Sequence, residues 1–301
     1  MKIAVLLTCH NRQAKTRNCL QSLKEALIAY NKNAKDQIKL EVFLTDDGCT
    51  DDTVEVAIAV FPDPAVMHIL HGDGNLFWAG GMRFCWREAM RRHDEWDYYL
   101  LINDDTEMMD NLFDELFIAQ KYAIEQYGQE GLISGITCAK DDSKKLTYGG
   151  SVWKNRFLAT RSLLMPNGQP QSCDLTNANI LFVPKKVVDR LGIFYEGFRH
   201  GNADYDYSNT ACKAGIPVVL TAHFCGRCDR DHLDLKELAK KVVSMNLKQR
   251  RVYFKNPVHS SDDYLLLIKR ISPIRYPFVW IGRFLNLYLP KLYYRMSGLR
   301  D

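Results

Sequence analysis

The chain has 301 residues, enough to bury a large hydrophobic core in one large domain or two smaller ones. Its 47% hydrophobic and 25% charged residues are typical of a soluble globular protein, and no apolar run is long enough to span a membrane. The first apolar run is too short for a signal peptide, and nine scattered cysteines fit reduced thiols in a cytoplasmic protein better than disulfides.

Charge is divided unevenly along the chain. From residue 236 onward there are 14 of the 40 Lys and Arg residues but only 4 of the 36 Asp and Glu residues. The tail therefore carries about +10 and the body about −6, although the net charge is only +4. A basic tail predicts contact with something anionic.

The first 110 residues predict repeated units of strand, turn and helix. Apolar strands are expected at residues 3–8, 39–45, 67–70 and 97–102, with helices between them. This succession predicts an α/β fold with a mostly parallel central sheet flanked by helices. The turn after the first strand lacks both the glycine pattern of a dinucleotide site and a Walker-type lysine, which argues against NAD and P-loop chemistry.

Paired carboxylates follow two of these strands. Asp104 and Asp105 come after a run of aromatic and aliphatic residues, and Asp46 and Asp47 end the second strand. Ligands of open α/β sheets bind outside the carboxyl ends of the strands, so both pairs are predicted at a ligand site. Hard oxygens at that edge suit Mg²⁺ or Mn²⁺ bound with a diphosphate. Turns and helix caps are the alternative for the same residue types.

The second half continues with mixed elements. A helix is expected at 112–126, a strand at 131–138, and two more strands at 146–153 and 157–164 that fit a hairpin. The stretch 176–220 then predicts a strand, a helix, an aromatic loop and a further helix that opens on acidic residues.

Four segments of the first half occur in a recognisable order, namely TCHNR, LTDDGCTDDT, GNLFWAGGMRFCWREA and DYYLLINDDTEM. In this order and spacing they resemble the family 2 glycosyltransferases, which have the nucleotide-sugar-binding fold called GT-A. The stretch 176–220 resembles the family's acceptor-side segment, and the likeness covers roughly residues 1–228. It implies a catalytic domain at 1–235, with a nucleotide-sugar half at 1–110 and an acceptor half at 111–235, and a basic aromatic helical extension at 236–301.

The resemblance implies how a nucleotide-diphospho-sugar donor is held. Asp46 or Asp47 would accept hydrogen bonds from the base or ribose, and Asp105 would contact the Mn²⁺ or Mg²⁺ ion that acts as a Lewis acid on the diphosphate. Gly80 and Gly81 would bring backbone close to the ligand beside Trp78; a plain turn is the alternative. The expected nucleotide contacts are Thr8, Asn11, Arg12, Asp46, Asp47, Asn75, Gly80, Gly81 and Asp104, of which Asp104 contacts ribose, metal or water.

The acceptor side has its own candidates. Asp204 aligns with the family's general base, although Ala203 stands where the familiar motif has an acid, and Asp206 is either the base or a helix cap. A base opposite the leaving group implies inversion of the anomeric centre. Late metal-binding histidines of the family point to His223 or His232. A zinc site at Cys225 and Cys228 is disfavoured, because a structural zinc site needs a second such pair.

Aromatic and basic residues alternate in the tail after residue 275, a composition that suits an anionic membrane interface or packing on the catalytic domain. Nucleic acid fits less well, because no recognition motif accompanies the charge.

The sequence as a whole predicts an inverting glycosyltransferase of hexosyl or deoxyhexosyl type. It would move a sugar to a hydroxyl of a saccharide or lipid-linked saccharide in cell-surface polysaccharide synthesis, in the cytoplasm or peripherally on the inner face of the membrane. A nucleotidyltransferase is one alternative, although residues 9–12 are not the glycine-rich basic loop of that class. A non-catalytic nucleotide-sugar-binding subunit is another, because Ala203 has replaced an acid.

Overall fold

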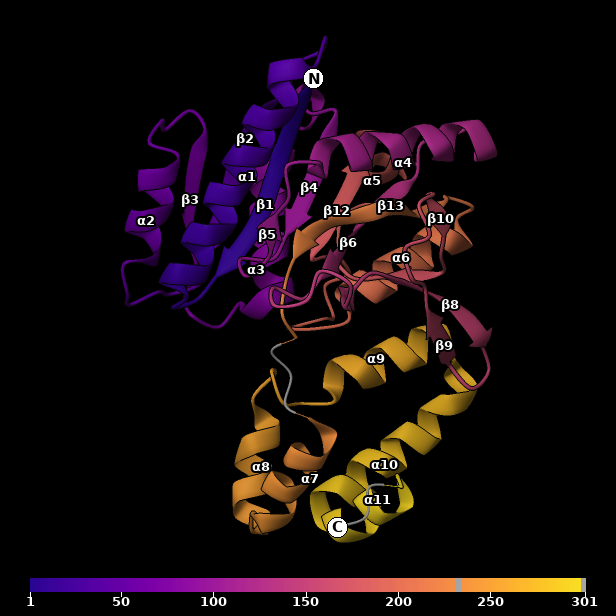
Figure 1. Cartoon of the computed structure of the whole chain (residues 1–301). Coiled ribbons are helices and arrows are strands. Elements are labelled where there is room, and N and C mark those ends of the chain that lie inside the picture. The colour runs from indigo at the N-terminus through magenta and orange to yellow at the C-terminus, as the bar shows by residue number, and fades with distance from the viewer. Residues whose placement is uncertain (231–233, 299–301) are drawn as a thin grey trace.

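A computed structural model describes residues 1–230 and 234–298 (Figure 1). In these residues a ten-stranded sheet runs in the order β10, β13, β6, β12, β4, β1, β2, β3, with β5 and β7 paired to β13 and β6. The strands of this sheet are β1 (Lys2–Cys9), β2 (Lys39–Asp46), β3 (Met67–His71), β4 (Tyr98–Ile102), β5 (Glu107–Met108), β6 (Leu132–Cys138), β7 (Leu146–Tyr148), β10 (Gln171–Ser172), β12 (Ile180–Pro184) and β13 (Val218–Arg227).

The N-terminal half of the sheet is parallel. Strand β1 pairs with β2 and β4, and β2 pairs with β3, all in the parallel sense. The central residues of β1 and β4 are buried, as expected for strands covered on both faces. Beyond β4 the sheet becomes mixed, because β12 runs antiparallel to both β4 and β6. The predicted α/β class is confirmed, with the parallel pairings concentrated in the first half.

Helices cover both faces of the sheet, and a hydrophobic cluster lies under each layer. One cluster includes side chains of α1, α2 and α4, and the other includes side chains of α3, α5 and α6. These helices are α1 (Gln13–Asn33), α2 (Thr53–Val60), α3 (Phe77–Met90), α4 (Leu112–Tyr127), α5 (Lys185–Leu191) and α6 (Ala203–Lys213), with the short 3₁₀ helix η1 (His93–Glu95) before β4.

A smaller sheet stands beside the main one. It consists of β11 (Leu175–Thr176), β8 (Gly150–Asn155) and β9 (Thr160–Leu163), and β8 and β9 form the expected antiparallel hairpin. It lies on the acceptor-side half predicted from the sequence.

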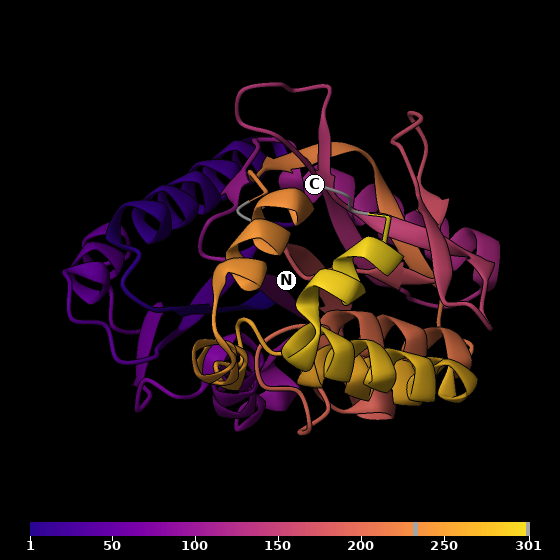
Figure 2. The same cartoon turned by 90° about the horizontal axis from the view of Figure 1, so that it is seen from below.

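The chain after β13 is helical. Its elements are α7 (Leu235–Ser244), α8 (Leu247–Lys255), α9 (Asp262–Ile271), the 3₁₀ helix η2 (Pro273–Arg275), α10 (Tyr276–Tyr288) and α11 (Pro290–Met296). Viewed from below, α7, α8, α10 and α11 form a layer at the end of the molecule opposite the N-terminus (Figure 2). Helix α9 packs against α6 of the catalytic part, so the extension is joined to it. Among the described helices, none is both long and apolar enough to cross a membrane.

Candidate active site

The carboxyl ends of β1, β2 and β4 lie at one edge of the sheet, because the three strands are parallel neighbours. Cys9 is in register with Asp46, and the turns that follow are tied together. The Nδ1 atom of His10 lies 2.7 Å from the carbonyl oxygen of Asp47. The candidate ligand-binding residues of the three turns therefore lie at one edge of the sheet, as expected from the predicted parallel strands.

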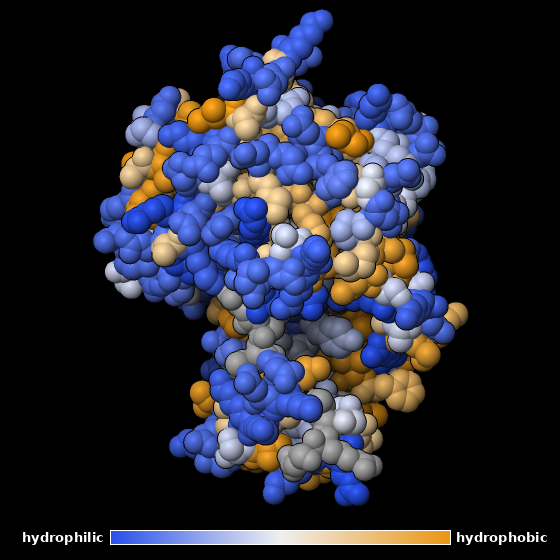
Figure 3. Space-filling view, viewed as in Figure 1, coloured by the Kyte–Doolittle hydropathy of each residue, from blue (hydrophilic) through white to orange (hydrophobic). Residues whose placement is uncertain are grey.

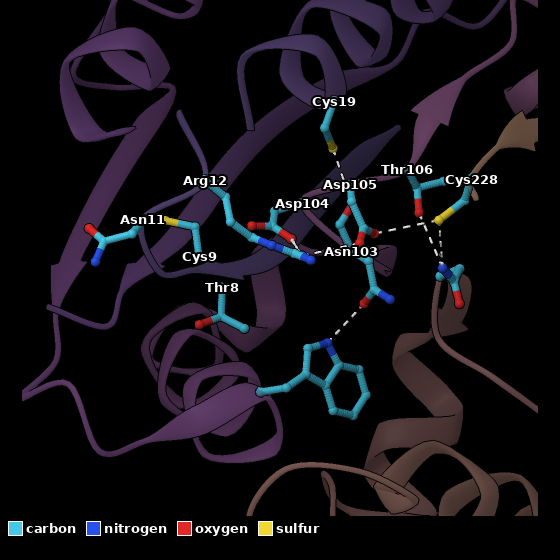
Figure 4. Close-up of polar contacts among 12 residues, drawn as sticks. Thr8, Cys9, Asn11, Arg12, Cys19, Asn103, Asp104, Asp105, Thr106 and Cys228 are labelled. Carbon is cyan, nitrogen blue, oxygen red and sulfur yellow. Dashed lines mark hydrogen bonds and ion pairs between the residues drawn. The ribbon is translucent and has the colours of Figure 1, made fainter. Parts of the chain in front are cut away.

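Arg12 joins the first turn to the acidic pair after β4 (Figure 4). Its Nη1 atom donates to Asp104 Oδ1 at 2.7 Å and lies 3.1 Å from Asp105 Oδ2. Asp104 is buried, whereas Arg12 and Asp105 are partly exposed. The guanidinium thus neutralises two adjacent carboxylates, of which Asp105 is partly exposed at the sheet edge.

Burial governs the chemistry of Asp104. It raises the pKa of this carboxyl to about 6, the nearby Arg12 charge lowers it, and the negative charge of Asp105 raises it further. Its second oxygen, Oδ2, is buried without a hydrogen-bond partner among the described residues. A buried carboxylate oxygen without a partner has unused capacity to bind a donor or a cation.

Asp104 and Asp105 are the residues that would hold a divalent cation. No cluster of three or more histidine, cysteine or acidic side chains arranged for a metal occurs within residues 1–230 and 234–298. Mg²⁺ and Mn²⁺ accept oxygen ligands and are commonly bound by one or two carboxylates together with substrate phosphates. The two carboxylates fit that mode, in which the substrate supplies the remaining ligands.

Asp46 and Asp47 already have partners in this structure. Asp47 accepts backbone N–H groups of Gly74, Leu76 and Phe77 at 2.9 to 3.2 Å. Asp46 accepts the N–H of Cys49 and lies 2.9 Å from His71 Nδ1. Both carboxylates therefore shape the loops around the site, and their contact with a base or ribose stays a prediction.

Gly80 and Gly81 lie inside α3, which rules out the alternative of a plain turn, and their predicted approach to a ligand stays a prediction. The sequence predicts helical character only from residue 82 onward, but the helix begins at Phe77, because the Asp47 carboxylate accepts N–H groups at its N-terminus. A Cβ atom at Gly81 would lie 2.2 Å from Thr8 Oγ1, so this glycine allows α3 to pack closely on β1. Thr8 itself is buried under the helix and donates to the carbonyl of Thr45 at 3.3 Å.

Asn11 and Asn75 stabilise loops at the same edge. Asn11 has a positive φ of 51° and accepts the N–H of Thr50 at 2.7 Å, which connects the first and second turns. Asn75 is exposed and donates to the carbonyl of Asp73 at 3.3 Å. Trp78 donates its indole N–H to Asn103 at 2.8 Å, a contact that places α3 over the end of β4 (Figure 4). Asn103 was not singled out from the sequence.

Asp204 lies in the first turn of α6 and is connected to this edge through β12. Its Oδ2 accepts the N–H of Ala178 at 3.1 Å and its Oδ1 accepts the N–H of Tyr205 at 2.8 Å. The next residue, Asn179, donates to Thr106 at 3.3 Å and to Cys228 Sγ at 3.5 Å. Cys228 in turn contacts Asp105 Oδ1 at 3.5 Å. Two short side-chain contacts therefore separate the acidic pair from the segment that holds Asp204.

A comparison of the sequence with known protein families identifies the family of the chain. Residues 4–164, about half of the chain, match a sequence model of the family described as Glycosyl transferase family 2. The chain belongs to glycosyltransferase family 2.

Solved structures agree with the GT-A fold of this glycosyltransferase. The mannosyltransferase PcManGT from Pyrobaculum calidifontis, in complex with GDP-Man and Mn²⁺, aligns over 99% of this chain and 75% of its own, with 12% identity and a TM-score of 0.50. S. aureus TarS 1–349 in complex with UDP-GlcNAc aligns over 99% of this chain and 92% of its own, with 10% identity and a TM-score of 0.54. No curated protein matches the sequence closely.

Burial raises the pKa of Asp204 in this glycosyltransferase to about 6, although its backbone hydrogen bonds lower it. Asp206, two residues later, is also buried but accepts an ion pair from Arg270 Nε of α9 at 2.5 Å. The two predicted base candidates therefore differ, because Asp206 has a cationic partner from the C-terminal extension.

The loop before Asp204 is held by a residue that sequence reasoning missed. Asp263, at the start of α9, is buried and accepts the backbone N–H groups of Arg199, His200 and Gly201 at 2.7 to 3.1 Å. The carbonyl of Arg199 accepts the N–H of Gly80, which ties the same loop to α3. The only sequence signal was an acidic residue in the first turn of a helix far along the chain.

The predicted ligand His223 does not form a metal-binding group with the acidic pair within the part of the chain that the structure describes. His223 lies in the irregular part of β13 and pairs with Glu115 of α4, with Nδ1 to Oε1 at 2.8 Å. Its backbone N–H donates to the same carboxylate, so local pairing explains its position. His232 lies outside the described residues. The free thiols of Cys225 and Cys228 are buried, and the described structure does not join them into a metal cluster.

Replacing Asp263 with alanine is expected to destabilise the fold. The substitution leaves three backbone N–H groups without their acceptor, and we expect the free energy of unfolding in urea to fall by about 3 kcal/mol. Asp262→Ala is the matched control, because Asp262 is exposed and pairs with Arg283 at the surface. It should change stability by less than about 0.5 kcal/mol. Equal effects of the two variants would contradict the role of Asp263 in holding the loop before Asp204.

Asp204→Asn is expected to change the pH dependence of stability. With its pKa raised to about 6, the folded chain binds the Asp204 proton more tightly than the unfolded chain does. Ionisation of buried Asp204 therefore lowers the free energy of unfolding of the wild type. This loss is absent below about pH 4 and complete above about pH 6, where it is about 3 kcal/mol. The stability of the variant relative to wild type should rise by that amount between pH 4 and pH 7. A difference that stays constant between pH 4 and pH 7 would contradict the raised pKa of Asp204.

Proposed function

We propose that this glycosyltransferase moves a sugar from a nucleoside diphosphate donor to an acceptor hydroxyl with inversion of the anomeric centre. The observation that supports this most directly is the meeting of Arg12, Asp104 and Asp105 at the sheet edge, linked through Asn179 to the segment that holds Asp204. One set of groups is suited to a departing diphosphate, and the other to an acceptor proton.

The donor side supplies charge for the diphosphate. Asp105, which is partly exposed, and the unpartnered oxygen of Asp104 would hold Mn²⁺ or Mg²⁺. The cation would act as a Lewis acid on the leaving diphosphate. Arg12 adds a positive charge to the same position, and its planar guanidinium suits phosphate oxygens. The turns after β1 and β2 would surround the nucleoside.

The acceptor side supplies the base. A carboxyl with a pKa near 6 is ionised at neutral pH and still basic enough to take a hydroxyl proton in the transition state. Asp204 is therefore our preferred base, and Asp206 is the alternative. A base on the face opposite the leaving group permits a single displacement, which inverts the reacting centre.

The proposed acceptor is a saccharide or lipid-linked saccharide, and the proposed transferred sugar is a hexose or deoxyhexose. The reaction would belong to the synthesis of a cell-surface polysaccharide. The basic extension favours a cytoplasmic protein held peripherally at the inner face of the membrane. A nucleotidyltransferase and a non-catalytic nucleotide-sugar-binding subunit are the competing functions, and the Asp204→Asn experiment below separates the transferase from the binding subunit.

Nucleoside diphosphate binding should depend on a divalent cation. Isothermal titration with UDP, GDP and dTDP, each with and without Mn²⁺, should reveal at least one nucleotide that binds tenfold or more tightly with the metal, because Asp104 and Asp105 alone repel phosphate. Asp105→Ala should remove this difference, and Asp110→Ala, an exposed acid nearby, should retain it. Metal-independent binding to all three nucleotides would contradict the proposed cation site.

Asp204→Asn should separate donor binding from turnover. Release of nucleoside diphosphate from UDP-, GDP- and dTDP-hexoses should fall by about 10² to 10⁴ because the variant lacks a proton acceptor. Donor affinity should change little. The wild-type rate should rise with pH through about 6, since the reactive form of Asp204 is the carboxylate. If turnover falls for Asp206→Asn but not for Asp204→Asn, Asp206 is the base, and turnover absent from wild type as well would favour the binding subunit.

A further inference from the structure

Helix α10 carries a ridge of aromatic side chains that face solvent. Trp280, Phe284 and Tyr288 follow one another at intervals of four residues, so they lie along one side of the helix. Their exposed fractions are 51%, 48% and 39%, and Ile281 beside them is 49% exposed. The rings are in contact in sequence, with centroids 6.3 Å apart for Trp280 and Phe284 and 4.6 Å apart for Phe284 and Tyr288.

This outward orientation is unusual for a helix of a globular protein. An amphipathic surface helix normally buries its apolar stripe against the core and exposes its polar side. In α10 no residue is fully buried, and the three aromatic residues with Ile281 form an exposed apolar ridge. Contiguous exposed apolar surface of this kind marks an interaction site rather than a single exposed side chain.

Basic side chains border the ridge. On the neighbouring helix α8, Lys248, Arg251 and Lys255 are exposed at intervals of three and four residues, so they share one face. The Arg251 guanidinium lies 5.8 Å from the centre of the Tyr288 ring, which places the basic face next to the aromatic one. On α11, Lys291 and Arg295 are also exposed. The space-filling view shows apolar and polar surface side by side at this end of the molecule (Figure 3).

We propose that the aromatic ridge of α10, with the basic residues of α8 and α11, docks on an anionic phospholipid bilayer. Aromatic rings favour the boundary between headgroups and acyl chains, and nearby lysines and arginines are attracted to anionic headgroups. A second copy of the chain is a poorer occupant, because it would bring two tails of about +10 together. An anionic bilayer has an apolar interior for the aromatic ridge and negative headgroups for the basic residues.

Docking here would also orient the catalytic part. Helix α9 connects to α10 through η2, and its Asp263 and Arg270 hold the loop and helix that carry Asp204. A membrane-bound extension would therefore keep the acceptor side at a fixed distance from the bilayer. This consequence rests on the proposed function, whereas the docking surface itself does not.

Vesicle sedimentation with the full-length chain tests the surface without substrate. We expect binding to vesicles of phosphatidylcholine with 30% phosphatidylglycerol, and at least tenfold weaker binding to phosphatidylcholine alone, because the basic residues are attracted only to the anionic lipid. Raising NaCl from 0.05 to 0.5 M should weaken the binding, since salt screens exposed charges. Equal binding to both vesicles, or to neither, would overturn the proposal.

Two variants locate the binding face. W280S/F284S/Y288S should reduce affinity for the anionic vesicles at least tenfold, and K248E/R251E/K255E should do the same through charge. The matched control I118S/I124S removes two exposed apolar residues of α4 and should bind as wild type. Circular dichroism and thermal unfolding establish that each variant is folded. Unchanged binding of the folded ridge variant would overturn the proposal.

Light scattering at the same protein concentrations tests whether a second copy of the chain covers the ridge instead. A wild-type dimer that W280S/F284S/Y288S converts to a monomer would assign the ridge to a second copy and overturn the lipid proposal. Nucleotide titration of the same variants keeps the two proposals apart. Variants that lose vesicle binding but retain metal-dependent nucleotide binding leave the transferase proposal intact, and failure of nucleotide binding leaves the vesicle result intact.

Discussion

The contact between one guanidinium and two carboxylates is the interaction on which the candidate donor site depends. Asp104 and Asp105 are adjacent in sequence and one of them is buried, so their mutual repulsion and the loss of hydration both oppose ionisation. Arg12 comes from the turn after β1 and supplies the opposing charge at 2.7 and 3.1 Å. The parallel pairing of β1 and β4 makes this possible, because it places both turns at one edge.

The change in sheet direction at β12 brings the acceptor side to the same edge. Because β12 is antiparallel to β4, residues just before it, Ala178 and Asn179, lie beside residues just after β4. Ala178 then binds Asp204, while Asn179 contacts Thr106 and Cys228. A wholly parallel sheet would have placed the start of β12 at the far edge, so the mixed topology is part of the construction of the site.

The C-terminal extension contributes to this construction and also has a surface of its own. In helix α9, the Asp263 carboxylate accepts three backbone N–H groups and Arg270 pairs with Asp206. These contacts fix α9 to the catalytic part. Helix α10 follows after only four residues, yet its aromatic side faces outward. Within the basic extension, α9 therefore packs on the catalytic part, whereas α10, which begins the aromatic tail after residue 275, leaves one face uncovered.

Much of the fold and part of the site followed from the sequence. The strands at 3–8, 39–45, 67–70 and 97–102 were predicted within two residues, because each is an apolar run that ends at a turn. The position of Asp104 and Asp105 at a sheet edge followed from the same pattern. The order of motifs identified the family, and the family model covers the residues that carry them.

Contacts between segments far apart in the chain were decided only by the tertiary structure. Local patterns do not reveal that Asp47 caps the loop before α3, that Gly81 makes room for Thr8, or that His223 pairs with Glu115. They also do not reveal the partners of Asp263 and Arg270, which are more than sixty residues away. Periodicity determines which residues form strands and helices, whereas the partner of a buried polar group depends on which elements pack together.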